Sequence, residues 1–251
     1  MKIKIYLGET ECQIDLNSPI DISIPLLSGP DTVNAWYCEP LRIEPVVMGD
    51  WIGDVSKGGS VNFRNVFLNP HGNGTHTECM GHISKELHSL NRELTTFFSF
   101  CSVVSIAPEP LGHDHVITED RLRVSHIHPE AEAVAIRTLP NGDEKVRRHY
   151  SNTNPPYMAA DAVRYLVDRG IKHLLIDLPS IDRERDEGAL AAHHVFWNYP
   201  EAPRHGTTIS EFIFIPDNVP DGLYLLNLMI TSLENDASPS KPILYQINEL
   251  G

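Results

Sequence analysis

Residues 155–177, PPYMAADAVRYLVDRGIKHLLID, decide the fold class of this chain. Their apolar side chains recur at helical spacing, at Met158, Ala162, Val163, Leu166 and Val167. The proline pair favours a helix start and Gly170 favours a stop, so the pattern predicts a helix over 157–169. The apolar run at 173–177 then predicts a strand. A helix followed directly by a buried strand indicates an α/β arrangement.

Outward from this segment, strand patterns are more frequent than helix patterns. Alternation or β-branched residues predict strands at 3–6, 12–15, 20–24, 62–68, 103–107, 134–138, 211–215, 223–230 and 243–247. Nineteen prolines and sixteen glycines divide the chain into short elements. We therefore expect a mixed, strand-rich α/β fold. The length of 251 residues predicts a single domain over 1–251.

Composition excludes several classes of function. The net charge of −14 and the absence of a Lys/Arg-rich run argue against a nucleic-acid surface. No apolar run approaches the length of a membrane span, and residues 1–6 alternate like a strand rather than a signal peptide. Four scattered cysteines without CxxC spacing favour reduced thiols. We expect a cytoplasmic protein with neither a nucleic-acid nor a membrane partner.

The chemistry of the chain is concentrated in residues 71–82, HGNGTHTECMGH, which hold three histidines and one carboxylate. Imidazole and carboxylate groups are the usual ligands of zinc, manganese and iron. His76 and Glu78 are two positions apart, so in an extended segment they point the same way. The alternative is a polar loop that is rich in histidine. The density of ligands favours a hydrolytic metal site.

The same segment resembles the signature His-x-Gly-Thr-His-x-Asp-x-Pro-x-His of the cyclase-like metal hydrolases. That family includes bacterial kynurenine formamidases and isatin hydrolases. Gly74, Thr75, His76 and His82 match the signature in register. The resemblance continues through the helix and strand at 157–182 and through 211–230.

The segment departs from the signature at three points. Glu78 stands where the family has Asp, and Met80 stands where it has Pro. His71 precedes His76 by five residues instead of four. The longer Glu78 side chain changes the reach of the carboxylate, so the metal or its outer partners could sit differently.

The resemblance implies a swivelling β/β/α domain that assembles as a homodimer or homotetramer. It also implies that one histidine of the pair at 193–194 enters the site, and the apolar residues that follow favour His193. In a helix, neighbouring residues point about 100° apart, so only one of the pair fits one site. Glu211 takes the place of a family ligand.

Two arrangements of the metal centre stay open. In a one-metal site, His71, His76 and Glu78 bind the ion, while His82 and His193 act as base and proton relay. In a two-metal site, Glu78 bridges the ions, and the second ion is held by His82, His193 and Glu211. We predict His71, His76, Glu78 and Glu211 as metal ligands. His82 and His193 are then the predicted catalytic residues.

The remaining histidines are predicted to lie outside the site. His205 belongs to a Pro- and Gly-rich insertion at 199–206. Such a loop could reshape the mouth of the pocket, but we expect His205 to be a solvated loop residue. Four others lie in polar, turn-like stretches, at His113, His115, His126 and His128.

The resemblance implies a hydrolase that opens an amide, lactam or ester bond of a small molecule with metal-activated water. The cofactor is expected to be divalent, Zn or Mn. The alternatives are a metal-dependent lyase or cyclase, and a metal-dependent binding protein without turnover. Conventional nucleophile, phosphate and dinucleotide motifs do not occur in the sequence.

Overall fold

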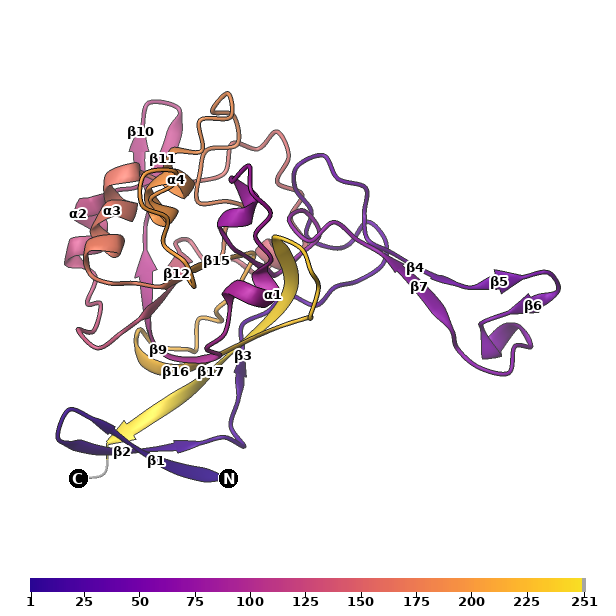
Figure 1. Cartoon of the computed structure of the whole chain (residues 1–251), viewed down its shortest axis with the longest axis horizontal. Helices are drawn as coiled ribbons and strands as arrows, with labels where there is room; N and C mark the ends of the chain where they lie inside the picture. Colours follow the sequence, from indigo (N-terminus) through magenta and orange to yellow (C-terminus); the bar gives the residue numbers. More distant parts are fainter. Residues whose placement is uncertain (250–251) are drawn as a thin grey trace.

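A closed sheet of seven strands forms the centre of the computed structural model, which describes residues 1–249 (Figure 1). The strands follow one another in the order β17, β16, β9, β12, β14, β15 and β8, and a further pairing between β8 and β17 closes the ring. Their bounds are β8 His76–Glu78, β9 Phe98–Ile106, β12 Ala133–Thr138, β14 His173–Ile176, β15 Thr208–Glu211, β16 Gly222–Ile230 and β17 Ala237–Glu249. The fold is a strand-rich α/β fold, as the sequence predicts.

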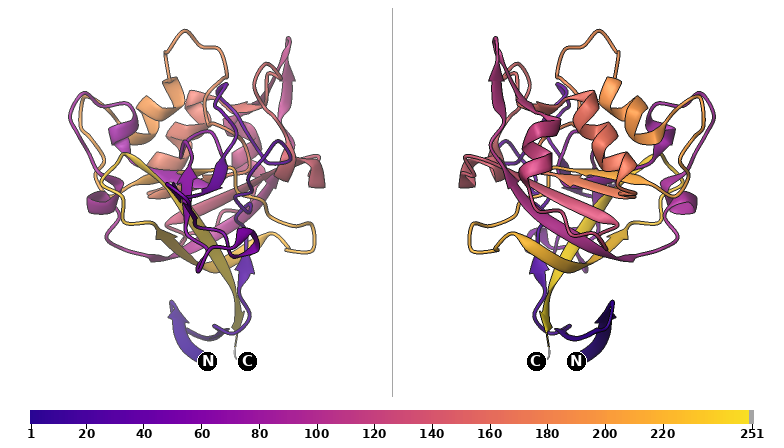
Figure 2. Two further views of the ribbon diagram at one scale, coloured as in Figure 1. Left: turned by 90° about the vertical axis from the view of Figure 1, so that its right-hand side faces the viewer. Right: turned by 90° about the vertical axis from the view of Figure 1, so that its left-hand side faces the viewer.

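The parallel part of the ring consists of β9, β12, β14 and β15. Parallel neighbours need crossover connections, and helices provide them here. The helices are α2 Glu119–Val124, α3 Ala160–Asp168 and α4 Ala191–Trp197. Figure 2 shows these three helices gathered on one side of the sheet.

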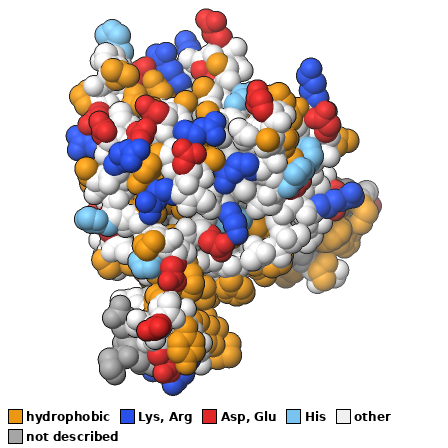
Figure 3. Space-filling model, turned by 60° about the vertical axis from the view of Figure 1, so that its left-hand side comes forward, with side chains coloured by type: hydrophobic (Ala, Val, Ile, Leu, Met, Phe, Trp, Pro, Cys, Tyr) orange, Lys and Arg blue, Asp and Glu red, His pale blue; other side chains and the backbone are white. Residues whose placement is uncertain are grey.

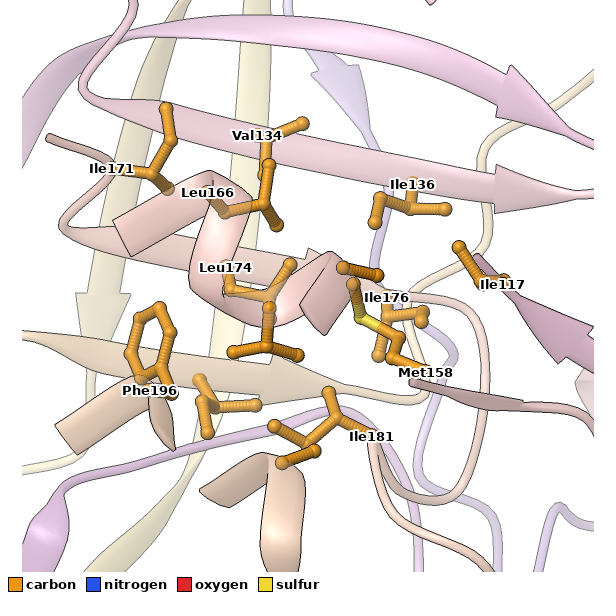
Figure 4. Close-up of a cluster of buried hydrophobic side chains, with 14 of the residues drawn as sticks. Ile117, Val134, Ile136, Met158, Leu166, Ile171, Leu174, Ile176, Ile181 and Phe196 are labelled. Atoms are coloured by element: carbon orange, nitrogen blue, oxygen red, sulfur yellow. The ribbon is translucent and has the colours of Figure 1, made fainter. Parts of the chain in front are cut away.

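Alternation along the strands separates two hydrophobic cores. In β12, Val134 and Ile136 point toward the helices, whereas Ala133 and Ala135 point into the ring. This is the period of two expected of a strand that is buried on both faces. Figure 4 shows the helix-side core, where Leu166 of α3 packs over β12 and β14. The functional site described below lies on this helix side of the ring.

The predicted helix at 157–169 begins later than expected. Tyr157–Met158 forms the short strand β13, which pairs in parallel with β11 Asp114–Ile117, and α3 starts only at Ala160. The pairing with β11 outweighs the helical spacing of Met158. The strand predicted at 20–24 is also shorter, because only Ile20–Asp21, β3, pairs with β17.

The prediction that Glu211 heads a strand at 211–215 is wrong. Glu211 is the last residue of β15, and the next residue, Phe212, has a φ of 54°. This left-handed conformation turns the chain out of the ladder. Thr208 and Ser210 interrupt the apolar pattern of β15, so local sequence does not indicate the strand, although all four of its residues are buried.

An arm formed by residues 42–67 extends away from the ring (Figure 1). It contains β4 Arg42–Pro45 paired with β7 Arg64–Phe67, and β5 Val47–Met48 paired with β6 Trp51–Ile52. A hairpin of β1 Lys2–Leu7 and β2 Thr10–Asp15 projects elsewhere and pairs with the end of β17. The other short elements are β10 Glu109–Leu111, η1 Val55–Lys57, η2 Met80–His82, η3 Asp143–Arg147 and α1 Leu90–Glu93.

The surface in Figure 3 carries Lys and Arg interspersed with Asp and Glu, with hydrophobic side chains between them. Within residues 1–249 no disulfide joins the four cysteines, and three of them are buried. Within residues 1–249, no helix has both the length and the apolar character needed to cross a membrane.

Candidate metal centre and active site

Strand β8 positions the first two groups of the site. His76 and Glu78 point to the same face of the strand, and both are fully buried. The residue between them, Thr77, points to the opposite face, where its hydroxyl lies 2.7 Å from the hydroxyl of Ser210. The spacing of two residues therefore places an imidazole and a carboxylate together on the helix side of the ring.

The strands on either side of β8 each bring a carboxylate to the same place. In β15, Glu211 is the register partner of His76, and its Oε2 lies 3.4 Å from His76 Nε2. On the other side, Asp236 immediately precedes β17. Its backbone oxygen accepts a hydrogen bond from the Cys79 N–H, and its Oδ2 lies 2.9 Å from His71 Nε2.

Helix α4 supplies the histidine from the opposite layer. His193 is buried, and its Nε2 lies 3.1 Å from Glu78 Oε1 and 3.8 Å from Glu211 Oε1. Its Nδ1 lies 2.6 Å from Oδ2 of Asp182, which also accepts backbone hydrogen bonds from Ala192 and His193. Asp182 thus fixes both the start of the helix and the orientation of the imidazole.

Two histidines next to β8 complete the group. His71 Nδ1 lies 3.0 Å from Glu78 Oε2, and His82 Nδ1 lies 3.7 Å from the same oxygen. The additional residue between His71 and His76 is taken up by a turn in which the Asn73 N–H donates to the Asn69 carbonyl. Gly74 has a φ of 151°, and a Cβ there would lie 2.4 Å from Leu26, so the position requires glycine. We call these six residues the Glu78 cluster: His71, His76, Glu78, His82, His193 and Glu211.

Two buried atoms of the cluster are suited to bind a metal ion. His76 Nδ1 lies 2.9 Å from the carbonyl oxygen of Gly74, to which it donates, so Nε2 carries the lone pair of a neutral ring. That Nε2 makes no hydrogen bond, and neither does Glu78 Oε2, although Glu211 Oε2 and His71 Nδ1 lie 3.4 Å and 3.0 Å from them. Buried polar atoms without partners are costly. Both belong to a set formed by His71, His76 and Glu78, whose ligand atoms lie within 4.8 Å of one another.

Without a metal ion, protons must balance the buried carboxylate. Burial by itself would lower the pKa of His193, but its contacts with Asp182 and Glu78 raise the pKa to about 10. Burial likewise opposes the charged form of His71, whereas Asp236 and Glu78 raise its pKa to about 10. Burial acts to raise the pKa of Glu78, but the surrounding histidines hold it well below the usual value. The cluster therefore requires positive charge, either as protons or as a metal ion.

A cavity of about 290 Å³ opens onto this cluster. His71, His82, His193 and Glu211 line one part of it. Trp36 and Leu190 add an aromatic and an apolar side chain to the lining, and the rest of it is mostly polar or charged, including Arg183 and Glu184. Such a lining, with a few convergent polar groups, is typical of a small-molecule site.

All six residues singled out in the sequence lie together, although their roles as ligands or catalysts stay predictions. Of the histidine pair, His193 enters the cluster, whereas His194 Nδ1 lies 2.9 Å from the Tyr199 carbonyl. His205 lies elsewhere, 3.1 Å from Glu93. Within residues 1–249, the possible ligand groups do not include His113, His115, His126 or His128.

Two residues that contact the cluster were missed as members of the site. Asp182 was noted only as part of the segment that resembles the family, because the loop that brings it to the backbone N–H groups of Ala192 and His193 leaves no local pattern. Asp236 gave no local signal, because its position depends on the pairing between β17 and β8. The hydrogen bonds that Asp236 accepts from His71 and His82 lower its pKa.

Known proteins resemble the chain over most of its length. A family model described as putative cyclase matches residues 14–183. A kynurenine formamidase from Bacillus mycoides (strain KBAB4) is 26% identical over 196 residues, which cover 75% of this chain and 82% of the relative. A kynurenine formamidase from Bacillus anthracis is 25% identical over 246 residues, covering 95% of this chain and all of the relative.

Solved structures share the fold at lower identity. Isatin hydrolase A from Labrenzia aggregata, bound to benzyl benzoate, aligns with a TM-score of 0.66 and 17% identity over 91% of this chain and 93% of its own. A structure described as a potential metal-dependent hydrolase with cyclase activity aligns with a TM-score of 0.65 and 20% identity, over 91% of this chain and 97% of its own.

Proposed function

The chain belongs to the putative cyclase family, and from that premise we propose that it is a metal-dependent hydrolase of non-peptide C–N bonds in small amides or lactams. The kynurenine formamidases that it resembles, at 25–26% identity, support this reaction class. The fold shared with an isatin hydrolase is consistent with it. Within the chain, the metal-binding geometry at β8 supports the same conclusion.

The observation that carries the proposal is that two buried atoms, His76 Nε2 and Glu78 Oε2, make no hydrogen bond although imidazole and carboxylate groups surround them. A buried imidazole that donates through Nδ1 to a backbone carbonyl presents its other nitrogen as a ligand. His71 and Glu211 lie next to these atoms and extend the donor set. Imidazole nitrogens and carboxylate oxygens in this combination suit Zn²⁺ or Mn²⁺.

A divalent ion held by His71, His76 and Glu78 would supply Lewis acidity, which polarises a carbonyl oxygen and makes water nucleophilic at neutral pH. The protein has to move protons during the reaction, because amide hydrolysis takes a proton from water and gives one to the leaving nitrogen. His82 is suited to this task because its half-exposed ring lines the cavity. His193 is held by Asp182 and faces the same space.

The number of ions depends on how the two oxygens of Glu78 are used. Oε2 faces His71 and His82, whereas Oε1 faces His193. A second set of ligand atoms, on Glu78, His82 and His193, also lies within 4.8 Å. With one ion, His82 and His193 remain free to transfer protons. With two ions, Glu78 would be shared between them, and His82, His193 and Glu211 would help to hold the second.

The cavity favours a compact substrate with a planar apolar part. Its volume of about 290 Å³ suits a molecule of one or two rings. Trp36 and Leu190 line the cavity and supply an aromatic and an apolar side chain for such a ring. A formylated aryl amine and a fused aryl lactam both combine a flat ring with a C–N bond at its edge.

A metal-loading and turnover experiment tests the proposal. The purified protein is stripped of metal, reloaded with Zn²⁺ or Mn²⁺, and assayed on an N-formyl aryl amide and on an aryl lactam. We expect metal-dependent hydrolysis that disappears in His76→Ala together with the metal of the Glu78 cluster, whereas the exposed-residue variant His113→Asn retains both. Unchanged metal per chain in His76→Ala would contradict the assignment. Metal binding without turnover on an amide and lactam panel would favour a binding protein, and turnover without uptake of water would favour a lyase or cyclase.

We further propose that the protein forms a homo-oligomer through the arm at 42–67. Its strands expose Val47, Met48 and Val66, each more than half accessible, together with Phe63. An extended element with this much exposed apolar surface is typical of an interface with another copy. Light scattering after size exclusion should show a dimer or larger species that Val66→Lys weakens. We also propose a cytoplasmic location, in which cysteines that form no disulfide within residues 1–249 stay reduced.

A further inference from the structure

A second group of potential metal ligands lies outside the proposed active site. It consists of His88, Glu93 at the end of α1, and His205 in the insertion at 199–206. The Nδ1 atoms of His88 and His205 lie 3.2 Å and 3.1 Å from the same oxygen, Glu93 Oε1. We call this group the Glu93 cluster. We propose that it binds one divalent transition-metal ion, for which Zn²⁺ is the appropriate probe.

The distances fit tetrahedral coordination. Zn–N and Zn–O bonds of about 2.0–2.1 Å place neighbouring ligand atoms about 3.3–3.4 Å apart in a tetrahedron. The two measured separations are within a few tenths of an ångström of that value, and the three ligand atoms lie within 4.8 Å of one another. Only a small adjustment of the side chains is needed for an ion to bind.

The surroundings leave one side of this site open to water. Side-chain exposure falls from 64% for His205 to 22% for His88 and 14% for Glu93. The second oxygen of Glu93 accepts a hydrogen bond of 2.9 Å from the Gly206 N–H, so the carboxylate is already oriented. Three protein ligands with water in the remaining position form a complete zinc coordination sphere.

The ion would link two segments of the chain, one that follows His82 and one that follows the helix carrying His193. His88 and Glu93 follow His82 along the chain, whereas His205 follows α4, which carries His193. The two segments also meet at Tyr199, whose hydroxyl donates to Glu86 and accepts from the Lys85 N–H. A bound ion would therefore stabilise the insertion against the segment at 84–93. This inference concerns a site that is separate from the proposed catalytic metal.

Metal binding by matched variants tests the proposal. Metal-free protein is dialysed against a buffered excess of Zn²⁺ and analysed for zinc per chain. His205→Asn and Glu93→Gln should each bind one zinc less than the unaltered protein. His113→Asn removes an exposed histidine outside these clusters and should bind the full amount. Equal zinc in all four proteins would show that the cluster forms only hydrogen bonds and ion pairs, and would overturn the proposal.

A second measurement separates this site from the proposed active site. In the His76→Ala background, added Zn²⁺ should still raise the melting temperature, and further replacement of His205 by Asn should abolish that rise. Ligand binding to the folded state stabilises it in proportion to ln(1 + [Zn²⁺]/Kd). A rise that persists in the double variant would assign the stabilising ion to other residues. Failure of the hydrolase assay has no bearing on either measurement.

Discussion

The Glu78 cluster and the Glu93 cluster use the same side chains in very different surroundings. Glu78 is fully buried and is approached by three histidines, whereas Glu93 retains partial exposure and gives one oxygen to a backbone N–H. Burial makes an uncompensated charge expensive, so the Glu78 cluster depends on protons or a metal ion. Solvent and the Gly206 N–H stabilise Glu93 without an ion. The comparison indicates that burial, more than ligand type, separates a catalytic centre from a stabilising site.

The largest difference between the clusters should appear when each carboxylate becomes an amide. Glu78→Gln removes the charge that would help His71 and His76 hold an ion, so activity should fall by more than the ~10²–10⁴-fold typical of losing an acid–base group. Glu93→Gln should retain activity within a few-fold, because Glu93 does not line the cavity. Rates at saturating metal and zinc per chain measure both effects. Equal losses of activity in the two variants would contradict the distinction.

Within the Glu78 cluster, His82 should matter for turnover more than for metal retention. His82→Ala should keep most of its metal and lose ~10²–10⁴ in rate, because a half-exposed imidazole at the cavity is suited to proton transfer. The measurement combines kcat at saturating metal with metal per chain. Loss of metal in proportion to activity would instead make His82 a ligand and favour the two-metal arrangement. Retention of both would exclude the proposed role.

The local sequence predicted the parts of the site that depend on spacing. His76 and Glu78 share a face because side chains alternate along a strand, and β8 has that geometry. His193 faces inward because α4 is helical and its neighbour His194 points elsewhere. The family resemblance added Glu211, but the sequence reading placed it at the wrong end of its strand. Phe212 adopts a positive φ that no local pattern indicated.

The remaining features depend on contacts between distant segments. Asp236 reaches His71 only because β17 pairs with β8 and closes the ring. His205 reads as a solvated loop residue until Glu93, far away in the sequence, is placed beside it. Of the arm at 42–67, only the strand at 62–68 was predicted, because the strands pair with one another and expose apolar side chains on both sides. Alternation of buried and exposed positions therefore could not reveal the rest of it.

Asp182 allows a finer test of how the buried cluster is held. Asp182→Asn should weaken metal binding or activity by ~10–100-fold, the usual effect of losing a residue that orients a site histidine. The carboxylate contacts His193 Nδ1 and the N-terminus of α4, so the loss should be smaller than for Glu78→Gln. Metal affinity and rate are measured separately. If Asp182→Asn costs as much as Glu78→Gln, then Asp182 acts directly on the metal or substrate.

The smallest expected effect is a pH dependence of the metal-free protein. The raised pKa values of His71 and His193, both about 10, mean that the folded state binds protons more tightly than the unfolded chain, whose histidines titrate near 6.5. Their contribution to stability is therefore complete below pH 6.5 and is lost as the pH rises toward 10. Between pH 7 and 9.5 the melting temperature should fall by several degrees, since 1 kcal/mol corresponds to ~2–4 °C in a chain of this size.

His71→Asn should reduce this fall, whereas Glu93→Gln should leave it unchanged, because the pKa of Glu93 is lowered and its carboxylate stays ionised throughout this range. The same protons compete with metal, so zinc affinity at the Glu78 cluster should increase over the same interval. A melting temperature that rises with pH in the metal-free protein would show that the histidines around Glu78 are neutral, and would remove the charge argument that distinguishes the two clusters.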